Sequence, residues 1–225
     1  MKIVTWNLMR PTYRTESRNT LFLSEIKNLE ADIVVLTETN SIVSLGKPYF
    51  SLSSLPLPST FEELKYFPGE NRVSIFSKFP LGRQFETADP YTSICTELIT
   101  PQGNLIVYGT IIGVTGGKNE RFVKEIEDQK EDIRRIINYG NVCVVGDYNI
   151  SFSGYPYPSE QTAEKFKDFL TQQSLNILTS EIANIPDHIA ISAAFPLKLK
   201  SPAEVKIFPK SVTDHSLISL ELVQP

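Results

Sequence analysis

Polar side chains that could bind a metal ion or a phosphate group follow several apolar, strand-like runs. Asp147 and Asn149 follow VCVVG, and Glu38 follows IVVLT. Asp147 and Asn149 are two positions apart, so an extended chain would place both side chains on one face. Strand ends in packed α/β proteins meet at one edge, where ligands bind. A strand that ends in a polar turn also explains GDYN on its own, so the other polar positions must decide.

The same arrangement recurs elsewhere along the chain. Asn7 follows the run IVTW, and the chain's two histidines each directly follow an aspartate beside a strand-like run. These pairs are Asp187-His188, within DHIAIS, and Asp214-His215, before SLISLEL. A lone histidine is most often structural, but the recurrence of the pattern predicts that these side chains form one site.

This set of residues limits the chemistry. The sequence has no G-x-S-x-G motif, and GGK at 116–118 is followed by Asn119, so the phosphate-binding loop motif is incomplete. Cys95 and Cys143 lie in apolar runs, which predicts buried free thiols and not zinc ligands. The remaining oxygen ligands suit Mg²⁺ or Mn²⁺, beside which a histidine can donate to a phosphoryl oxygen. Metal-assisted phosphoester hydrolysis therefore fits better than acyl or glycosyl transfer.

Composition narrows the class of protein further. The chain has 225 residues, 41% of them hydrophobic, which is enough for a sizeable core, and we expect one domain over residues 1–225. A net charge of −4 argues against a broad basic face that grips duplex DNA. It leaves open a nucleic acid bound by a local basic rim. Neither a membrane-spanning run nor a targeting segment is visible, so a cytoplasmic protein is expected.

Hydrophobic periodicity predicts the elements that position these residues. Strands are expected at 2–8, 32–36, 72–77, 93–99, 105–112, 141–145, 188–192 and 217–223. Amphipathic helices are expected at 18–30, 120–139 and 160–173, with Gly140 ending the second and Ser159 capping the third. The Pro- and Ser-rich stretch 45–60 reads as a surface loop. This order of elements favours a mixed sheet, or two packed sheets, covered by helices.

The chain resembles the endonuclease/exonuclease/phosphatase superfamily of DNase I-like enzymes. The matching stretches occur in the family's order: IVTWNL (3–8), IVVLTET (33–39), NRVSIFSKFP (71–80), LIVYGTII (105–112), VVGDYN (144–149), PDHIAIS (186–192) and VTDHSLISLEL (212–222). Each is weak alone, but together they are specific. The resemblance implies a four-layer α/β sandwich, in which two packed mixed β-sheets are flanked by helices.

The resemblance also implies roles for the polar residues. Glu38 would be the principal ligand of a divalent ion, Mg²⁺ or Mn²⁺. Asn7 would position metal-bound water or phosphate, and Asp214 would lie near the metal. These three positions carry the expected metal site.

The remaining roles concern the attacking water and the phosphate. Asp147 would orient or deprotonate the water, and Asn149 would bind the phosphoryl oxygens. His215 would contact a non-bridging oxygen, with Asp187 as its hydrogen-bonded partner. His188 is given no catalytic role.

The sequence departs from the family pattern at several places. Ile111 stands where many members have a histidine, and Met9 stands where the abasic-endonuclease branch has an aspartate. The leaving-group acid is therefore left open. Candidate substrate contacts are Arg10, Arg72, Tyr108 and Lys118, although alternation places Tyr108 on the opposite strand face from Ile111. Specificity is expected from the loops at 10–18, 45–70, 114–120 and 150–160.

Three functions are consistent with these observations. The first is a divalent-metal-dependent phosphodiesterase or nuclease that uses a metal-positioned water for in-line attack. The second is a phosphomonoesterase for a small phosphorylated metabolite or lipid headgroup, which the acidic charge favours. The third is a non-catalytic binding module, whose only support is the missing histidine at Ile111. The expected partner is a phosphate-ester substrate, with nucleic acid as one class; no protein partner is inferable.

Overall fold

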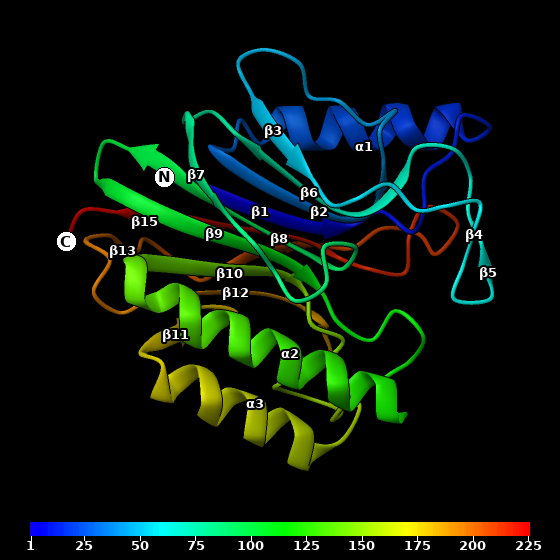
Figure 1. Cartoon of the computed structure of the whole chain (residues 1–225). Coiled ribbons are helices and arrows are strands. Elements are labelled where there is room, and N and C mark those ends of the chain that lie inside the picture. Colours follow the sequence, from blue (N-terminus) through cyan, green and yellow to red (C-terminus); the bar gives the residue numbers. More distant parts are fainter.

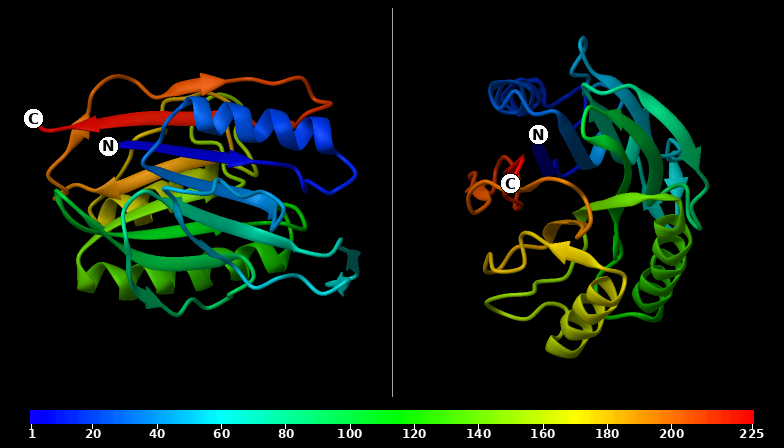
Figure 2. Two further views of the ribbon diagram at one scale, coloured as in Figure 1. Left: turned by 90° about the horizontal axis from the view of Figure 1, so that it is seen from above. Right: turned by 90° about the vertical axis from the view of Figure 1, so that its left-hand side faces the viewer.

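Two β-sheets pack face to face and are covered by helices on both outer sides (Figures 1 and 2). This architecture is seen in a computed structural model that describes residues 1–225. The seven-stranded sheet has the order β13 (Lys198–Leu199), β15 (Leu217–Val223), β1 (Lys2–Asn7), β2 (Ile33–Asn40), β6 (Glu70–Ser77), β3 (Phe50–Ser53), with β14 (Glu204–Lys206) also on β15. The six-stranded sheet has the order β11 (Leu175–Ile177), β12 (Asp187–Ser192), β10 (Asn141–Asp147), β9 (Gly103–Ile111), β8 (Ser93–Thr100), β7 (Leu81–Phe85). The predicted fold class is confirmed.

The helices form the outer layers. Helix α1 (Glu16–Asn28) covers the seven-stranded sheet, while α2 (Glu120–Ile136) and α3 (Glu160–Gln172) cover the other (Figure 2). The 3₁₀ turn η1 (Ile137–Tyr139) extends α2, and Ser159 caps α3 as predicted. None of these helices has the length and hydropathy needed to cross a membrane.

Strict alternation along the strands separates the core into three clusters. Ile3, Val35 and Val145 lie in the cluster between the sheets, whereas Val4 packs under α1 and Val144 under α2 and α3. Each interior strand therefore buries both faces, as its nearly continuous apolar sequence predicts. Cys95 and Cys143 are buried free thiols, and burial raises the pKa of Cys143 to about 12.

One loop prediction is wrong. Residues 45–60 contain β3, which pairs with β6 at the edge of the seven-stranded sheet. Leu45 and Leu57 are buried on either side of it. The strand was not predicted because Phe50–Ser53 is short and lies among prolines and serines. An edge strand also needs only one apolar face, so its apolar pattern is weak. The same stretch leads into a small hairpin of β4 (Thr60–Phe61) and β5 (Leu64–Lys65).

Candidate active site

The carboxyl ends of β1, β2, β9 and β10 lie at one end of the sandwich. Strands β1 and β2 are parallel, as are β9 and β10, and β1 packs across from β10 and β12. In Figure 1 this is the end at which the β4–β5 hairpin projects. Asn7, Asp147 and Asp187 share the strand faces of Ile3, Val145 and Ile189, which belong to the core between the sheets. Alternation therefore brings these three polar side chains into the space between the sheets.

Gly146 allows β10 to approach β9 closely just before Asp147. Its φ is 139°, and an added Cβ would lie 2.0 Å from the carbonyl oxygen of Thr110. No other residue fits there without separating the strands. The glycine of GDYN therefore has a packing role that sets the position of the carboxylate.

Glu38 breaks the alternation of β2. Alternation would place it with Val34 and Leu36 beneath α1, yet its side chain lies beside Asn7 at the end of the sheets and lines a cleft there. Its φ of 44° is left-handed, a backbone state that costs a non-glycine residue about 1–3 kcal/mol. The strained residue lies at the position expected to hold the metal.

Asp147 accepts hydrogen bonds from two asparagines. Nδ2 of Asn7 donates to its Oδ2 at 3.0 Å, and the backbone N–H of Asn149 donates to its Oδ1 at 2.9 Å. Nδ2 of Asn149 lies 2.7 Å from the carbonyl oxygen of Ile112 and 3.3 Å from Asp147. Asp147 and Asn149 do meet, but not by sharing a strand face. Strand β10 ends at Asp147, and Asn149 turns back with a φ of 49°.

His215 is held by Asp187. Nδ1 of the imidazole lies 2.6 Å from Oδ2 of Asp187, while Nε2 lies 4.0 Å from Oδ2 of Asp147 and 3.8 Å from Oδ1 of Asp214. Because Nδ1 is engaged, only Nε2 remains to contact a ligand. The predicted pairing of His215 with Asp187 is present in the structure.

The charges of this cluster are strongly coupled. Burial alone would lower the pKa of His215, but Asp187 and Asp147 outweigh it and raise that pKa to about 10. Burial raises the pKa of Asp147 to about 7 even though the charge of His215 opposes the rise. Burial also raises the pKa of Glu38. At neutral pH His215 is therefore an imidazolium. Its single positive charge does not fully compensate the negative charges of the carboxylates around it.

Two contacts that the sequence did not predict position this cluster. The hydroxyl of Thr213 donates to the carbonyl oxygen of Asn7 at 3.0 Å and accepts from the N–H of His215 at 3.1 Å. Oδ1 of Asn7 accepts from the N–H of Met9 at 2.8 Å. A threonine two positions before a histidine is a local turn signal that could have identified Thr213.

His188 takes no part in the site, as expected. It lies on the opposite face of β12 from Asp187 and is fully buried between Thr179 and the carbonyl oxygen of Ile150. Burial lowers its pKa to about 4, so it is neutral. Nε2–H donates to Ile150, and the hydroxyl of Thr179 donates to Nδ1.

A cleft opens beside Glu38 and shows which predicted loops reach the site. Its lining comes from three of them: Arg10, then Leu57, Leu64, Tyr66 and Glu70, then Val114. Strand residues Thr39, Asn71 and Arg72 complete it. Residues of the 150–160 loop are absent from this lining. Tyr66 and the hairpin were missed because nothing in the local pattern marks a two-residue strand.

The two arginines of the cleft are already paired. Arg10 contacts Glu70 at 2.8 Å and stacks over Tyr66, with part of its side chain exposed. Arg72, predicted as a phosphate contact, is 2% exposed and lies 2.7 Å from Glu62, the hairpin turn residue. Glu62 also pairs with Arg121 at 2.5 Å. Only one terminal nitrogen of the Arg72 guanidinium is engaged, by Glu62 and by the hydroxyl of Tyr66, whereas its other two nitrogens are buried without a partner, so the expected phosphate contact stays a prediction.

Two other candidate substrate contacts are not part of the cleft. Tyr108 is fully buried under α2, and its hydroxyl lies 3.1 Å from Asp132. Its prediction is wrong because alternation points it away from the space between the sheets. Lys118 is exposed and lines a separate groove between α2 and α3 with Val123 and Pro158. Ile111 is fully buried, so no hydrogen-bonding side chain replaces the expected histidine.

The side chains present fit a divalent cation. Asp147, Asp187 and His215 form a group whose ligand atoms lie within 4.8 Å of one another. Oδ1 of Asp187 is buried without a hydrogen-bond partner. Glu38 and the exposed Asp214 add two more carboxylates, and the raised pKa of Glu38 reflects a carboxylate short of compensating charge. Oxygen-rich sites of this kind suit Mg²⁺ or Mn²⁺.

Comparison with solved structures finds the same fold over nearly the whole chain. The human Nocturnin catalytic domain with bound sulfate has a TM-score of 0.70 at 20% identity, covering 99% of this chain and 94% of that one. A 3'-5' exonuclease (NExo) from Neisseria meningitidis has a TM-score of 0.65 at 16% identity, covering 99% of each chain. An AP endonuclease from Archaeoglobus fulgidus has a TM-score of 0.68 at 13% identity, covering 99% of each chain. These likenesses show the fold.

Sequence comparisons give the family. No curated protein matches the chain. The model of the Endonuclease/Exonuclease/phosphatase family matches residues 4–185, which include the strands that carry Asn7, Glu38 and Asp147. The chain belongs to the endonuclease/exonuclease/phosphatase family.

Proposed function

We propose that the chain is a divalent-metal-dependent phosphoester hydrolase, and specifically a phosphodiesterase or nuclease in which a positioned water attacks phosphorus in line. One observation carries the proposal. Nε2 of His215 and Oδ2 of Asp147 face each other at 4.0 Å, too far for a hydrogen bond. A cationic donor and a carboxylate acceptor therefore border the same small space, which suits a phosphoryl oxygen and an attacking water.

Each side chain then has a task. Asp147, held by Asn7 and Asn149, orients the water and accepts its proton. His215, fixed by Asp187, donates from Nε2 to a non-bridging oxygen. Nδ2 of Asn149 can keep its hydrogen bond to the carbonyl oxygen of Ile112. Its second N–H, which makes the longer 3.3 Å contact with Asp147, can then donate to the phosphate.

The metal site proposed here consists of Glu38, with Asn7 and Asp214 beside it. A Mg²⁺ or Mn²⁺ ion bound there would supply positive charge to the phosphoryl oxygens. Glu38 lines the cleft through which a substrate would enter. The left-handed backbone at Glu38 supports this role, because such strain gathers at functional positions.

The neighbours support a nucleic acid as the substrate. They include a 3'-5' exonuclease, an AP endonuclease and a Neisseria 3' phosphatase bound to product DNA hairpin. The last of these acts on a monoester, so a phosphomonoesterase is the second candidate. We also propose that residues 1–225 form one domain, which near-complete coverage by several solved structures supports. A cytoplasmic location stays a prediction.

The proposal is tested by a hydrolysis screen in Mg²⁺, Mn²⁺ and EDTA. Substrates are bis-p-nitrophenyl phosphate, p-nitrophenyl phosphate, single-stranded DNA, RNA and an abasic duplex, and Asp147→Asn is the blank. We expect metal-dependent hydrolysis that is faster on diesters than on the monoester, and lost in His215→Ala and Glu38→Ala. Full activity in both variants, or in EDTA, would overturn the assignment. Faster monoester hydrolysis would select the second candidate.

A further inference from the structure

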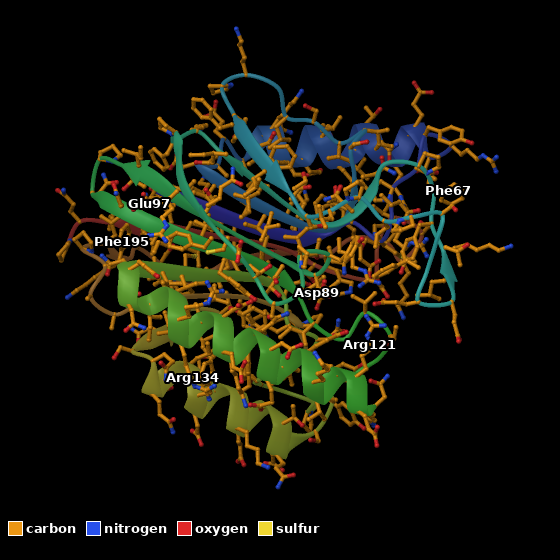
Figure 3. The ribbon with its side chains drawn as sticks, viewed as in Figure 1. Phe67, Asp89, Glu97, Arg121, Arg134 and Phe195 are labelled. Atoms are coloured by element: carbon orange, nitrogen blue, oxygen red, sulfur yellow. The ribbon has the colours of Figure 1, made fainter.

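Exposed aromatic rings and arginines lie in the β1–α1 loop and next to Tyr66, a residue that lines the cleft. Tyr13 is 61% exposed and Phe67 is 39% exposed. The Arg14 guanidinium lies 5.5 Å from the ring of Tyr13 and 5.9 Å from that of Phe67. Phe67 projects at the hairpin end of the molecule, far from Phe195 at the opposite end (Figure 3). We call Tyr13, Arg14, Arg18 and Phe67 the arginine–aromatic surface.

This surface is close in the chain to residues of the cleft that contains Glu38. Arg10 and Tyr66 line the cleft and stack on each other at 4.6 Å. Tyr66 directly precedes Phe67, and Arg10 lies in the same loop as Tyr13. A chain whose phosphate occupies the cleft would therefore place its neighbouring units over these exposed rings.

The two outer arginines have no carboxylate partner. The guanidinium of Arg14 makes one hydrogen bond, to the hydroxyl of Tyr13. That of Arg18 donates to the carbonyl oxygen of Met9 at 2.8 Å, and its Nε is buried without a partner. Positive charge thus remains unneutralised next to the rings in a chain whose net charge is −4. An anionic backbone is the complementary ligand.

Hydrogen bonds within the loop hold the backbone next to Tyr13. The carbonyl oxygen of Thr12 accepts from Thr15 Oγ1 at 2.9 Å and from Asn19 Nδ2 at 2.7 Å, and Thr12 Oγ1 accepts from the N–H of Arg14. The N–H of Met9 is tied to Asn7 in the site. The backbone that carries the ring is therefore ordered before any ligand arrives, which lowers the entropic cost of binding.

We propose that the arginine–aromatic surface binds unpaired bases of a single-stranded nucleic acid whose phosphate lies at Glu38. The inference rests on the proposed function and deepens it by naming the substrate class. Bases of a single strand expose their faces for stacking, whereas those of a duplex hide them. The surface offers ring faces together with guanidinium groups, and no broad basic face that would follow a duplex.

The test measures binding without hydrolysis. Fluorescence anisotropy in EDTA follows labelled oligoadenylate, as RNA and as DNA, a blunt duplex, and an abasic single strand that has phosphates but no bases. Proteins are the wild type, Tyr13→Ala/Phe67→Ala, and the conservative Tyr13→Phe/Phe67→Tyr. Each ring removed should weaken binding of the oligoadenylate about tenfold. The conservative variant should bind like the wild type, and the abasic strand should be insensitive to both variants.

Tyr139→Ala is the matched control. Tyr139 is 52% exposed and stacks with Arg83 at 4.6 Å, but it lies just before Gly140 and the start of β10, at the end of the sandwich opposite Asp147. Its removal should leave binding unchanged. Equal loss in Tyr139→Ala, equal loss on the abasic strand or the duplex, or no loss in Tyr13→Ala/Phe67→Ala would overturn the inference.

Hydrolysis of bis-p-nitrophenyl phosphate in Mg²⁺ separates the two proposals, since this substrate has no nucleobase. Tyr13→Ala/Phe67→Ala should retain the wild-type rate. A wild-type protein that hydrolyses nothing refutes the proposed function, while the anisotropy result still decides whether the surface binds bases.

Discussion

Asn7 and Asp147 belong to different sheets and are 140 residues apart, yet a 3.0 Å hydrogen bond joins their side chains. This contact aligns the two halves of the sandwich at the site. Asn7→Ala would leave Oδ2 of Asp147 without its strongest side-chain donor and free the carboxylate to turn. We expect kcat to fall about 10²-fold with little change in KM. Steady-state kinetics on a phosphodiester check this, and a change in KM alone would assign Asn7 to substrate binding.

Asp187 is expected to act through His215. Asp187→Asn preserves the shape of the side chain but removes the charge that holds the imidazolium, so His215 should lose both its orientation and its raised pKa. We expect kcat to drop about 10²–10⁴-fold, and the alkaline limb of the pH–rate profile to move to lower pH. An unchanged profile would show that Asp187 only supports folding.

Metal binding should be visible as stabilisation. Ligands that bind only the folded state raise its stability by mass action, so millimolar Mg²⁺ or Mn²⁺ should raise the melting temperature. Glu38→Gln should remove most of that rise, and Asp187→Asn should remove little, if Glu38 is the principal ligand. The opposite ranking, measured by differential scanning fluorimetry, would place the ion in the group of Asp147, Asp187 and His215 instead.

Gly146 should be intolerant of substitution for a reason other than its backbone angle. Gly146→Ala would place a Cβ 2.0 Å from the backbone oxygen of Thr110, whereas Gly140→Ala, at a similarly positive φ, meets nothing within 4 Å. We expect the first to cost on the order of 3 kcal/mol of unfolding free energy and the second about 1 kcal/mol. Urea denaturation of both variants measures the difference, and equal costs would refute the packing role.

His188 should make stability depend on pH. Its pKa is lowered to about 4 in the folded state from 6.5 when exposed, so between these values only the unfolded chain takes up the proton. Stability should therefore fall as pH drops from 6.5 to 4, by at most about 3 kcal/mol from this residue. His188→Gln should lose less stability over this range than the wild type. Urea melts at pH 7 and at pH 4.5 give the comparison, and parallel losses would contradict it.

Tyr108 provides a negative prediction. Its hydroxyl meets Asp132 under α2, so Tyr108→Phe should leave kcat and KM unchanged while costing about 1 kcal/mol of stability. Kinetics and a urea melt on one preparation suffice. If activity falls by a larger fraction than the amount of folded protein does, Tyr108 would be a substrate contact after all.

Period-two alternation explains what could be predicted. It placed Asn7 and Asp147 correctly, and it put Tyr108 and His188 on faces away from the site. Alternation alone would have placed the side chain of Glu38 under α1, because a left-handed residue reverses the face and no local pattern marks one. Nor could it predict that Arg72 would be buried, since its partner Glu62 sits on a hairpin too short to show a pattern. Glu38 was therefore predicted only from the family resemblance, and non-local pairing explains why the burial of Arg72 was missed.

The bond from Thr213 to the carbonyl of Asn7 spans 206 residues. Contacts between such distant parts of a chain form slowly, because the entropy of closing the loop must be overcome first. Strand β15 must also dock beside β1 before His215 can approach Asp147. During refolding, collapse and helix formation should therefore precede the return of catalysis. Recovery of the proposed hydrolysis would then report the docking of β15 beside β1, which joins distant parts of the chain.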